Sequence, residues 1–276
     1  MSITAQEVNK LRTMTGAGMM DCKKALTESD GDFEKAIDFL RKKGQKVSAS
    51  RTDKEASEGA VFVKTNAAAT EGIIVALNCE TDFVAKTEDF IKLGNTILEV
   101  AATKNPATAE ELANSLVNGR LVKDLMTDLM GKIGERVEIS AYEKVTGEAV
   151  VTYLHSNNKL GVLVALKNTA GANVAEVGKD VAMQIAAMKP IAVDKDGVDA
   201  KTIEREIEIG KEQARAEGKA EAMLEKIALG KLNKFYKDST LLNQEFVKDN
   251  SKTVAQMLDG VKKGLTVSAF KRISVA

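Results

Sequence analysis

The residues that could carry out catalysis in this 276-residue chain form no catalytic pattern. His155 is the only histidine, and a general base also needs a nucleophile or proton donor within reach, which the sequence does not identify. The motifs HExxH, GxSxG, GxGxxG and the P-loop are absent, and the 40 acidic residues show no spacing that singles out a pair. We therefore interpret His155 as a structural or interface residue and expect a binding protein, not an enzyme. An enzyme of unknown type that uses His155 is an alternative.

The two cysteines indicate neither a metal site nor a disulfide framework. Cys22 and Cys79 are far apart and form no CxxC pair, and neither has a neighbour that would activate its thiol. Residues 1–10 lack the apolar segment of a secretory signal and the Arg- and Ser-rich composition of a transit peptide. No apolar run approaches the roughly 20 residues that span a bilayer. We expect no metal, no cofactor, no membrane association and a cytoplasmic location.

The charge balance argues against a general nucleic-acid-binding protein. Lys plus Arg and Asp plus Glu number 40 each, whereas such proteins usually carry a basic excess. Trp is absent and aromatic residues make up only 4% of the chain, so few side chains could stack on single-stranded bases. We expect no direct nucleic-acid contact. The length suggests one or two domains and suffices for a sizeable apolar core.

The elements that would position a binding site begin with a three-helix module at residues 1–45. Thr4 and Glu7 fit a capping box, and Asp32 is a good N-cap for the third helix. Gly44 is predicted to end that helix. Apolar residues at helical spacing mark the inner faces, namely Val8 and Leu11, then Met19, Cys22 and Leu26, then Phe33, Ala36, Ile37 and Leu40. Residues 46–58 are polar and predict a linker; a basic contact strip is the alternative.

The rest of the chain predicts a two-part core with an inserted charged segment. The predicted parts are a core N-terminal subdomain (59–145), a core C-terminal subdomain (146–190 and 238–276) and a helical hairpin (191–237). Strands are predicted at 59–65, 72–79 and 136–145, and one more at the end of the chain. Two further strands are predicted on either side of a turn at 156–159. Helices are predicted around 90–101, 121–131, 177–188 and 251–258. Gly218 should divide the charged segment into two helices, with one long coiled-coil arm as the alternative. The alternation of sheets and helices predicts an α+β fold.

Two segments resemble signatures of the bacterial elongation factor Ts family. Residues 15–26 (TGAGMMDCKKAL) resemble its N-terminal signature, and residues 78–86 (NCETDFVAK) resemble its second signature, which contains the TDFV motif. Further likeness appears in KLGVLVALK, in FVKDNSKTV and in the charged hairpin between them, so the resemblance covers essentially the whole chain.

The resemblance implies a fold and a function. The fold is a ubiquitin-associated-like three-helix module, a two-part α+β core with antiparallel sheets, and a coiled-coil hairpin used in dimerisation or docking. The function is guanine nucleotide exchange on the GTPase elongation factor Tu, and family members include homodimers that join through the core C-terminal subdomain. A non-enzymatic adaptor with a ubiquitin-associated-like module is the alternative.

The resemblance also implies which residues contact the partner. Thr81, Asp82, Phe83 and Val84 form the TDFV group, which is implied to enter near the magnesium site of the GTPase. The other implied contacts are Arg12, Met19, Met20, Lys23, His155, Phe246 and Val247.

The residues themselves allow a plainer interpretation of these positions. Thr81 also fits a helix N-cap, Asp82 a first-turn acid and Phe83 a core residue. Met19 fits the apolar stripe of the second helix, whereas Met20 does not and is the better contact candidate.

The chain differs from the family pattern in two places. Glu245 stands where the family often has proline before the phenylalanine. The sequence stops at Ala276 without the continuation found in longer members, so we expect lower partner affinity.

Overall fold

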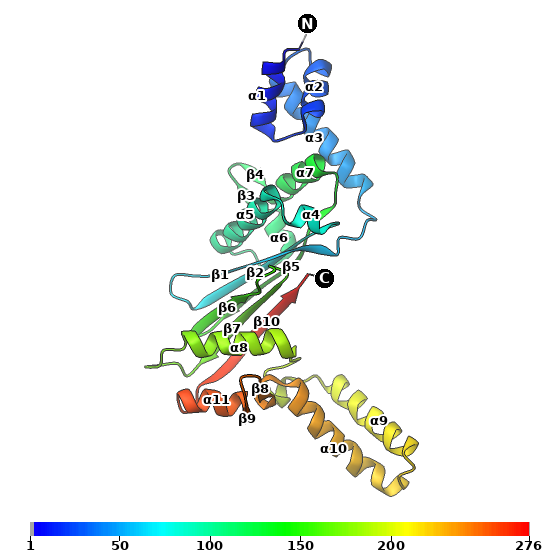
Figure 1. Ribbon diagram of the computed structural model, residues 1–276, viewed down its shortest axis with the longest axis vertical. Helices are drawn as coiled ribbons and strands as arrows, with labels where there is room; N and C mark the ends of the chain where they lie inside the picture. The colour runs from blue at the N-terminus through cyan, green and yellow to red at the C-terminus, as the bar shows by residue number, and fades with distance from the viewer. Residues whose placement is uncertain (1–2, 276) are drawn as a thin grey trace.

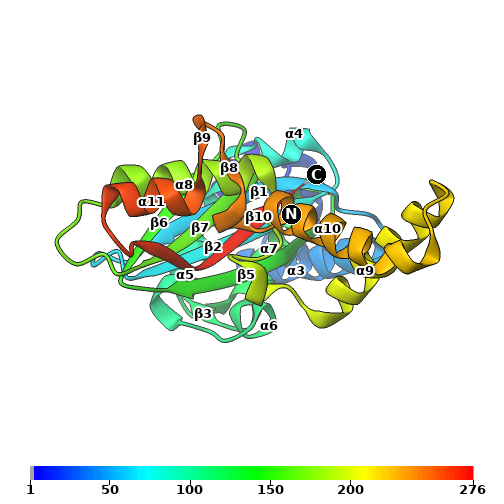
Figure 2. The same ribbon diagram turned by 90° about the horizontal axis from the view of Figure 1, so that it is seen from below.

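Figure 1 shows the computed structural model, which describes residues 3–275, as an elongated molecule. A helical module lies at one end, two packed sheets covered by helices lie in the middle, and a pair of long helices projects from the other end (Figures 1 and 2). The combination of helices with separate antiparallel sheets confirms the predicted α+β class.

The helical module consists of α1 (Ala5–Thr15), α2 (Met19–Glu28) and α3 (Phe33–Ser50). The capping box at the start of α1 is confirmed: Glu7 N donates to Thr4 Oγ1 at 3.2 Å, and Thr4 N donates to Glu7 Oε2 at 2.8 Å. Asp32 caps α3 as predicted. The buried residues of the module are Val8, Leu11, Cys22, Ala25, Leu26 and Ala36.

Helix α3 does not end at Gly44, so the sequence prediction is wrong there. The helix continues to Ser50 because Gly44 is buried against α7 (Val122–Ile133), where tertiary contact outweighs the low helix propensity of glycine. The first five residues of the segment predicted as a linker, 46–50, are therefore the last part of a helix, and the remainder up to residue 57 is irregular.

Two three-stranded antiparallel sheets pack face to face. The first has the order β1 (Glu58–Thr65), β2 (Glu71–Cys79), β5 (Val137–Thr146); the second has the order β10 (Thr266–Ser274), β7 (Leu160–Lys167), β6 (Ala149–Leu154). Both predicted hairpins are confirmed by their pairing. Between the sheets lies a shared apolar layer that includes Val61, Ile74, Ala76, Val150, Leu163 and Ala165.

Helices cover the outer face of each sheet (Figure 1). The first sheet is covered by α5 (Glu88–Lys104), α6 (Ala109–Ala113) and α7, and the second by α8 (Ala175–Met188) and α11 (Val254–Val261). The apolar residues at helical spacing in α5 and α8 are buried, namely Phe90, Leu93, Ile97, Ala101, Val177, Val181 and Ile185. Met188, the last residue of α8, is 46% exposed.

The charged segment forms a hairpin of α9 (Ala200–Ala216) and α10 (Glu221–Ser239), not one long arm. Gly218 lies in the connection with φ +75°, a conformation that glycine adopts at little cost. The two helices pack through small and aliphatic residues, namely Gly210, Ala214, Leu224, Ala228 and Leu232.

Short elements that the sequence analysis did not predict complete the structure. They are α4 (Asp82–Ala85), β3 (Leu116–Val117), β4 (Arg120–Leu121), β8 (Glu245–Phe246), β9 (Asp249–Thr253) and 3-10 turns at Lys195–Gly197 and Leu241–Asn243. None of the helices within residues 3–275 has both the length and the apolar character that a membrane crossing requires.

Candidate partner-binding site

The most conspicuous apolar group on the surface is the ring of Phe83. It is 80% exposed, more than any other large hydrophobic side chain in residues 3–275. Phe83 lies in the one-turn helix α4, directly after β2 and before α5. A single exposed aromatic residue is not unusual in itself, but a ring held in water by a rigid turn is well suited to insertion into a partner.

The turn that carries Phe83 is fixed by hydrogen bonds to a distant segment. Thr81 caps α4 by accepting a hydrogen bond from Val84 N at 3.4 Å. The backbone N–H and the hydroxyl of Thr81 both donate to the carboxylate of Glu135, at 3.0 and 2.7 Å. Because one carboxylate binds both groups, the backbone leading into Phe83 is held in one conformation.

Val84 faces the opposite way from Phe83. Its side chain is only 9% exposed and packs in the core between the first sheet and its helices, together with Ala85. Successive residues in a helix are turned by about 100°, so one turn can present Phe83 to solvent and Val84 to the core. The Val84 side chain therefore anchors the turn, and a partner contact remains a prediction for this residue.

Asp82 lies beside the ring and is paired with Lys86. The distance between Asp82 Oδ2 and Lys86 Nζ is 2.6 Å, one helical turn apart. The hydrogen bond from Lys86 lowers the pKa of Asp82, and the positive charge of Lys159 acts in the same direction. A lowered pKa means that the carboxylate is charged at neutral pH and that the pair is lost only as pH falls through that pKa.

A second exposed apolar surface lies on the helical module. Met19 and Met20 are 57% and 73% exposed, and both line a groove between α1 and α2 with Lys23. Arg12 is exposed and lines a neighbouring hollow. The placement of Met19 in the apolar stripe of the second helix is wrong, because α2 begins at Met19 and turns Cys22, Ala25 and Leu26 inward instead.

His155 lies in the turn between β6 and β7 and is exposed. Its Nδ1 is 2.8 Å from the hydroxyl of Tyr153. The same turn contains Lys159, which is paired with Glu58 of β1 at 2.6 Å. Lys159 lies near the turn that carries Phe83 because its partner Glu58 stands opposite Cys79, the last residue of β2.

Phe246 and Val247 occupy different environments. Phe246 is 6% exposed and belongs to the core beneath the second sheet, and a partner contact remains a prediction for this residue. Val247 is 45% exposed, and its N–H donates to Gln184 Oε1 at 2.9 Å, which fixes the backbone at this surface. A partner contact remains a prediction for Val247.

The structure therefore does not gather the sequence-predicted residues into one pocket. The turns that carry Phe83 and His155 are connected through the Lys159–Glu58 pair beside the end of β2. The methionines lie in α2, in the module at one end, and Val247 lies between β8 and β9, in the half of the core beside the hairpin (Figure 1). Three residues that hold the Phe83 turn could not be predicted from the sequence. Glu135 binds Thr81, and Glu80, which precedes Thr81, accepts hydrogen bonds from Arg51 and from the backbone of Arg136. Glu135 is 54 residues from Thr81 and meets it only because β5 pairs with β2, which no local pattern reveals.

Cys79, at the end of β2, has a thiol that donates to the carbonyl of Thr81 at 3.1 Å. Burial, helped by the charge of Glu135, raises the pKa of this thiol from 9.0 to about 12. Between these pH values the unfolded chain holds fewer protons than the folded chain, so the contribution of Cys79 to stability falls as pH rises from 9.0 to about 12.

We predict that iodoacetamide at about pH 8 does not label Cys79 or Cys22 in the folded chain, because both are buried and only the thiolate reacts. Both should be labelled after denaturation in urea. Mass spectrometry of the alkylated peptides measures this; rapid labelling of Cys79 in the native chain would contradict the burial and the raised pKa.

The chain is similar in sequence to known proteins that share one name. A family model described as Elongation factor TS matches residues 80–276. A protein named Elongation factor Ts from Cytophaga hutchinsonii is 68% identical over 276 residues, covering 100% of this chain and 99% of that protein. Proteins of the same name from Amoebophilus asiaticus and Flavobacterium psychrophilum are 55% and 50% identical over 275 and 274 residues, covering 100% and 99% of this chain and 99% of each relative. These matches include the helical module, which precedes the range of the family model.

Proposed function

The chain belongs to the elongation factor Ts family and is thus an elongation factor of protein biosynthesis, and from this premise we propose that it is a guanine nucleotide exchange factor. It binds elongation factor Tu in complex with GDP, promotes the release of GDP and allows GTP to bind. It has no catalytic site of its own and acts through contact alone.

The exposed ring of Phe83 is the observation on which the proposal rests. Had the ring been buried, as the plainer interpretation of the sequence holds, no apolar group of the TDFV motif could reach a partner. It is 80% exposed, while Val84 and the hydrogen bonds from Thr81 to Glu135 hold the turn beneath it. A rigid ring on a fixed turn can enter another protein without first losing much conformational freedom.

The physical basis of exchange is the sensitivity of the magnesium site in the GTPase. Mg²⁺ requires near-ideal octahedral geometry at about 2.0–2.1 Å, so a small displacement of its ligands weakens the bound nucleotide. Burying a phenylalanine ring supplies roughly 1.5–3 kcal/mol, which is available to deform the loops around the metal and phosphates. Each ~1.4 kcal/mol removed from the barrier accelerates release about tenfold. Asp82, charged and adjacent to the ring, positions the turn against the partner or disturbs the water shell of the ion.

Thermodynamic linkage explains how the factor is released. A protein that weakens GDP binding must bind less tightly whenever nucleotide is present. GTP entering the empty site therefore expels the factor, which can act again on another molecule of elongation factor Tu.

The remaining exposed residues supply further contacts in this proposal. Met20 and Met19 offer a flexible apolar surface on the module, beside the cations Arg12 and Lys23. His155 contacts the partner near Phe83, and Val247 contacts another part of it. The long α9–α10 hairpin serves in docking or dimerisation.

The test is release of labelled GDP from elongation factor Tu on addition of the wild-type chain. Acceleration supports the proposal, and an unchanged release rate refutes it. An adaptor with a ubiquitin-associated-like module would bind a partner without affecting the release of GDP. An enzymatic turnover that is lost on His155→Ala would instead support the enzyme alternative. We propose a cytoplasmic location and no direct contact with nucleic acid or membrane, consistent with the balanced charge.

A homodimer through the core C-terminal subdomain is part of the proposal. Strand β10 is an edge strand of the second sheet, and most of its residues are partly exposed, so its outer side is open to pairing with a strand of a second copy. We expect sedimentation of the isolated chain at micromolar concentration to show a dimer. A strict monomer there would remove dimerisation from the proposal and leave nucleotide exchange unaffected.

A further inference from the structure

Helices α3 and α7 cross at a contact between two glycines. A Cβ atom added to Gly44 of α3 would lie 2.9 Å from the carbonyl oxygen of Thr127, and one added to Gly131 of α7 would lie 2.7 Å from Gly44 Cα. Both distances end on backbone atoms of the opposite helix, which cannot rotate away as a flexible side chain can. The two helices are therefore closer than any residue with a side chain allows at these positions.

The crossing joins the helical module to the core. Helix α3 provides part of the module's own apolar core at one end, and near its other end it packs on α7, which covers the first sheet. Since one continuous helix makes both contacts, the angle at the crossing sets the direction in which the module points. Figure 1 shows α3 running from the module down to α7 and α4.

Polar contacts extend the junction on both sides of the glycines. Lys132 of α7 lies against the α1–α2 turn, since a Cβ on Gly16 would be 3.1 Å from its Nζ, and it is also paired with Asp89 of α5. At the far end of α3, Arg51 Nη1 is 3.1 Å from Glu80 Oε2. Glu80 immediately precedes Thr81, so α3 is tied directly to the turn that carries Phe83.

Arg136 strengthens the same end of the junction. Its Nη1 donates to the carbonyl of Thr52 at 2.5 Å and of Lys54 at 2.9 Å, while its backbone N–H donates to Glu80 Oε1 at 2.7 Å. Arg136 follows Glu135, which binds Thr81. The chain leaving α3 and the chain entering α4 are thus held by the same short segment that leads into β5.

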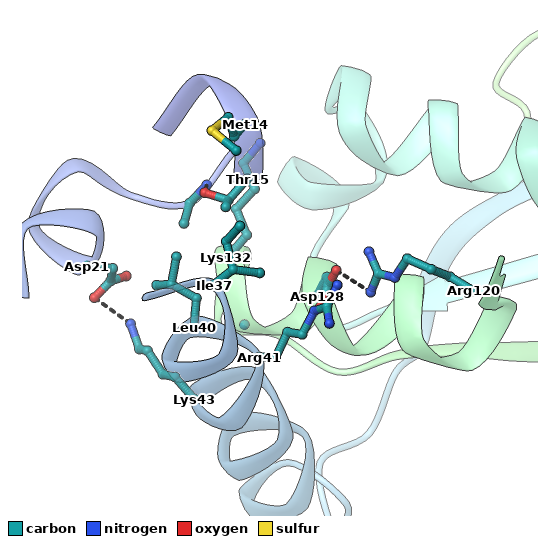
Figure 3. A pocket seen from close by; sticks show the side chains of 12 residues that line it. Met14, Thr15, Asp21, Ile37, Leu40, Arg41, Lys43, Arg120, Asp128 and Lys132 are labelled. Atoms are coloured by element: carbon teal, nitrogen blue, oxygen red, sulfur yellow. Dashed lines mark hydrogen bonds and ion pairs between the residues drawn. The ribbon is translucent and has the colours of Figure 1, made fainter. Parts of the chain in front are cut away.

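A cavity beside the crossing shows that the junction is not packed throughout. Figure 3 shows its lining, which comes from α1, α2 and their connection, from α3, from β4 and from α7. The cavity measures about 230 Å³, and ion pairs of Lys43 with Asp21 and of Arg120 with Asp128, each at 2.6 Å, lie at its rim. The first pair lies within the module and the second within the core, so neither crosses the junction. The module's orientation therefore depends on the glycine contact and on the polar contacts of Arg51 and Arg136, not on a continuous apolar interface.

We propose that the Gly44–Gly131 crossing is a positioning device that sets the distance and orientation between the exposed methionines of the module and the ring of Phe83. The consequence, which rests on the proposed function, is that the two surfaces engage a single partner together. Two linked contacts bind about 10²–10⁴ times more tightly than either alone, but only if the linking geometry lets both be made at once. A rigid crossing provides that geometry before binding.

The geometry is tested by a distance measurement on the full-length free chain. Spin labels are attached to Glu28→Cys on α2 and Asn95→Cys on α5, both exposed in helices, while the native cysteines are buried. We expect one narrow distance distribution for the parent chain and a shifted or broadened one for Gly131→Ala and Gly44→Ala. Gly230→Ala, at a helical glycine with open space around it, is the matched control and should leave the distribution unchanged.

The consequence is tested by GDP release from elongation factor Tu with unlabelled variants. Gly131→Ala should raise the concentration of the chain needed for half-maximal release about tenfold or more, with an unchanged rate at saturation, because Phe83 and its turn are intact. Gly260→Ala, at a glycine of α11 with open space around it, is the control for this assay and should behave as wild type.

A broad distribution in the parent chain, or an unchanged one in both glycine variants, overturns the inference, and the parent measurement decides even if a variant does not fold. If the spin-label distance shifts in Gly131→Ala but the concentration needed for half-maximal GDP release does not change, the proposal that the two surfaces engage one partner together is overturned. If the wild-type chain promotes no release at all, the proposed function fails, whereas the distance measurement still decides whether the crossing sets the geometry.

Discussion

Replacing Phe83 with alanine should slow the GDP release that the chain promotes by roughly tenfold to a hundredfold at saturating concentration. The ring is 80% exposed in the free chain, so its burial in a partner supplies roughly 1.5–3 kcal/mol that alanine cannot supply. Each ~1.4 kcal/mol corresponds to about a factor of ten in rate. Stopped-flow measurement with a fluorescent GDP analogue on elongation factor Tu gives the rate directly.

The same substitution should leave the folded chain intact. Few of the chain's own atoms touch an exposed ring, so the free energy of unfolding should change by no more than about 0.5 kcal/mol. Leu116→Ala is a suitable control, because Leu116 is also an exposed apolar residue, 56% accessible, but belongs to strand β3. Equal losses of exchange in both variants, or no loss for Phe83→Ala, would contradict the assignment of Phe83.

Replacing Phe90 with alanine should lower stability and not exchange, the reverse of Phe83→Ala. We expect a loss of about 3–5 kcal/mol in the free energy of unfolding. Phe90 lies in the first turn of α5 and is fully buried among Leu77, Ile97 and other residues of the core over the first sheet. Its removal leaves a cavity that the surrounding helices and strands can fill only in part. Urea unfolding followed by circular dichroism measures the change.

A loss of this size matters because domains are typically stable by only about 5–15 kcal/mol. Phe83→Ala is the natural reference for Phe90→Ala, since both remove the same ring from the same part of the chain. A Phe90→Ala chain as stable as wild type would show that the core over the first sheet is not packed as the structure describes. At a temperature where the variant is still folded, it should retain most of its exchange activity.

Local patterns predicted those features that depend on neighbouring residues. The capping box at Thr4, the N-cap at Asp32, the break at Gly218 and the two β-hairpins were all correctly predicted. These features follow from backbone conformation and side-chain periodicity over a few residues. The two signature segments likewise indicated the family through residues that are adjacent in the chain, and the similarity to known proteins confirms it.

Exposure was the property that the sequence predicted least well. Phe83, Val84, Phe246 and Met19 are all apolar, and their neighbours along the chain do not say which of them faces water. The structure places Phe83 and Met19 at the surface and buries Val84 and Phe246. Whether an apolar side chain is covered depends on segments far away in the sequence, so periodicity alone cannot decide it.

The sequence by itself determined the existence of the longer helices, the hairpins, the fold class and the family of this protein, because each is encoded in residues close together or in short motifs. Only the tertiary structure decided that α3 continues through Gly44, that Glu135 holds Thr81, and that Phe83 points outward. Each of these depends on contacts between residues dozens of positions apart, whose free energy outweighs local preference once the two sheets and their covering helices have packed.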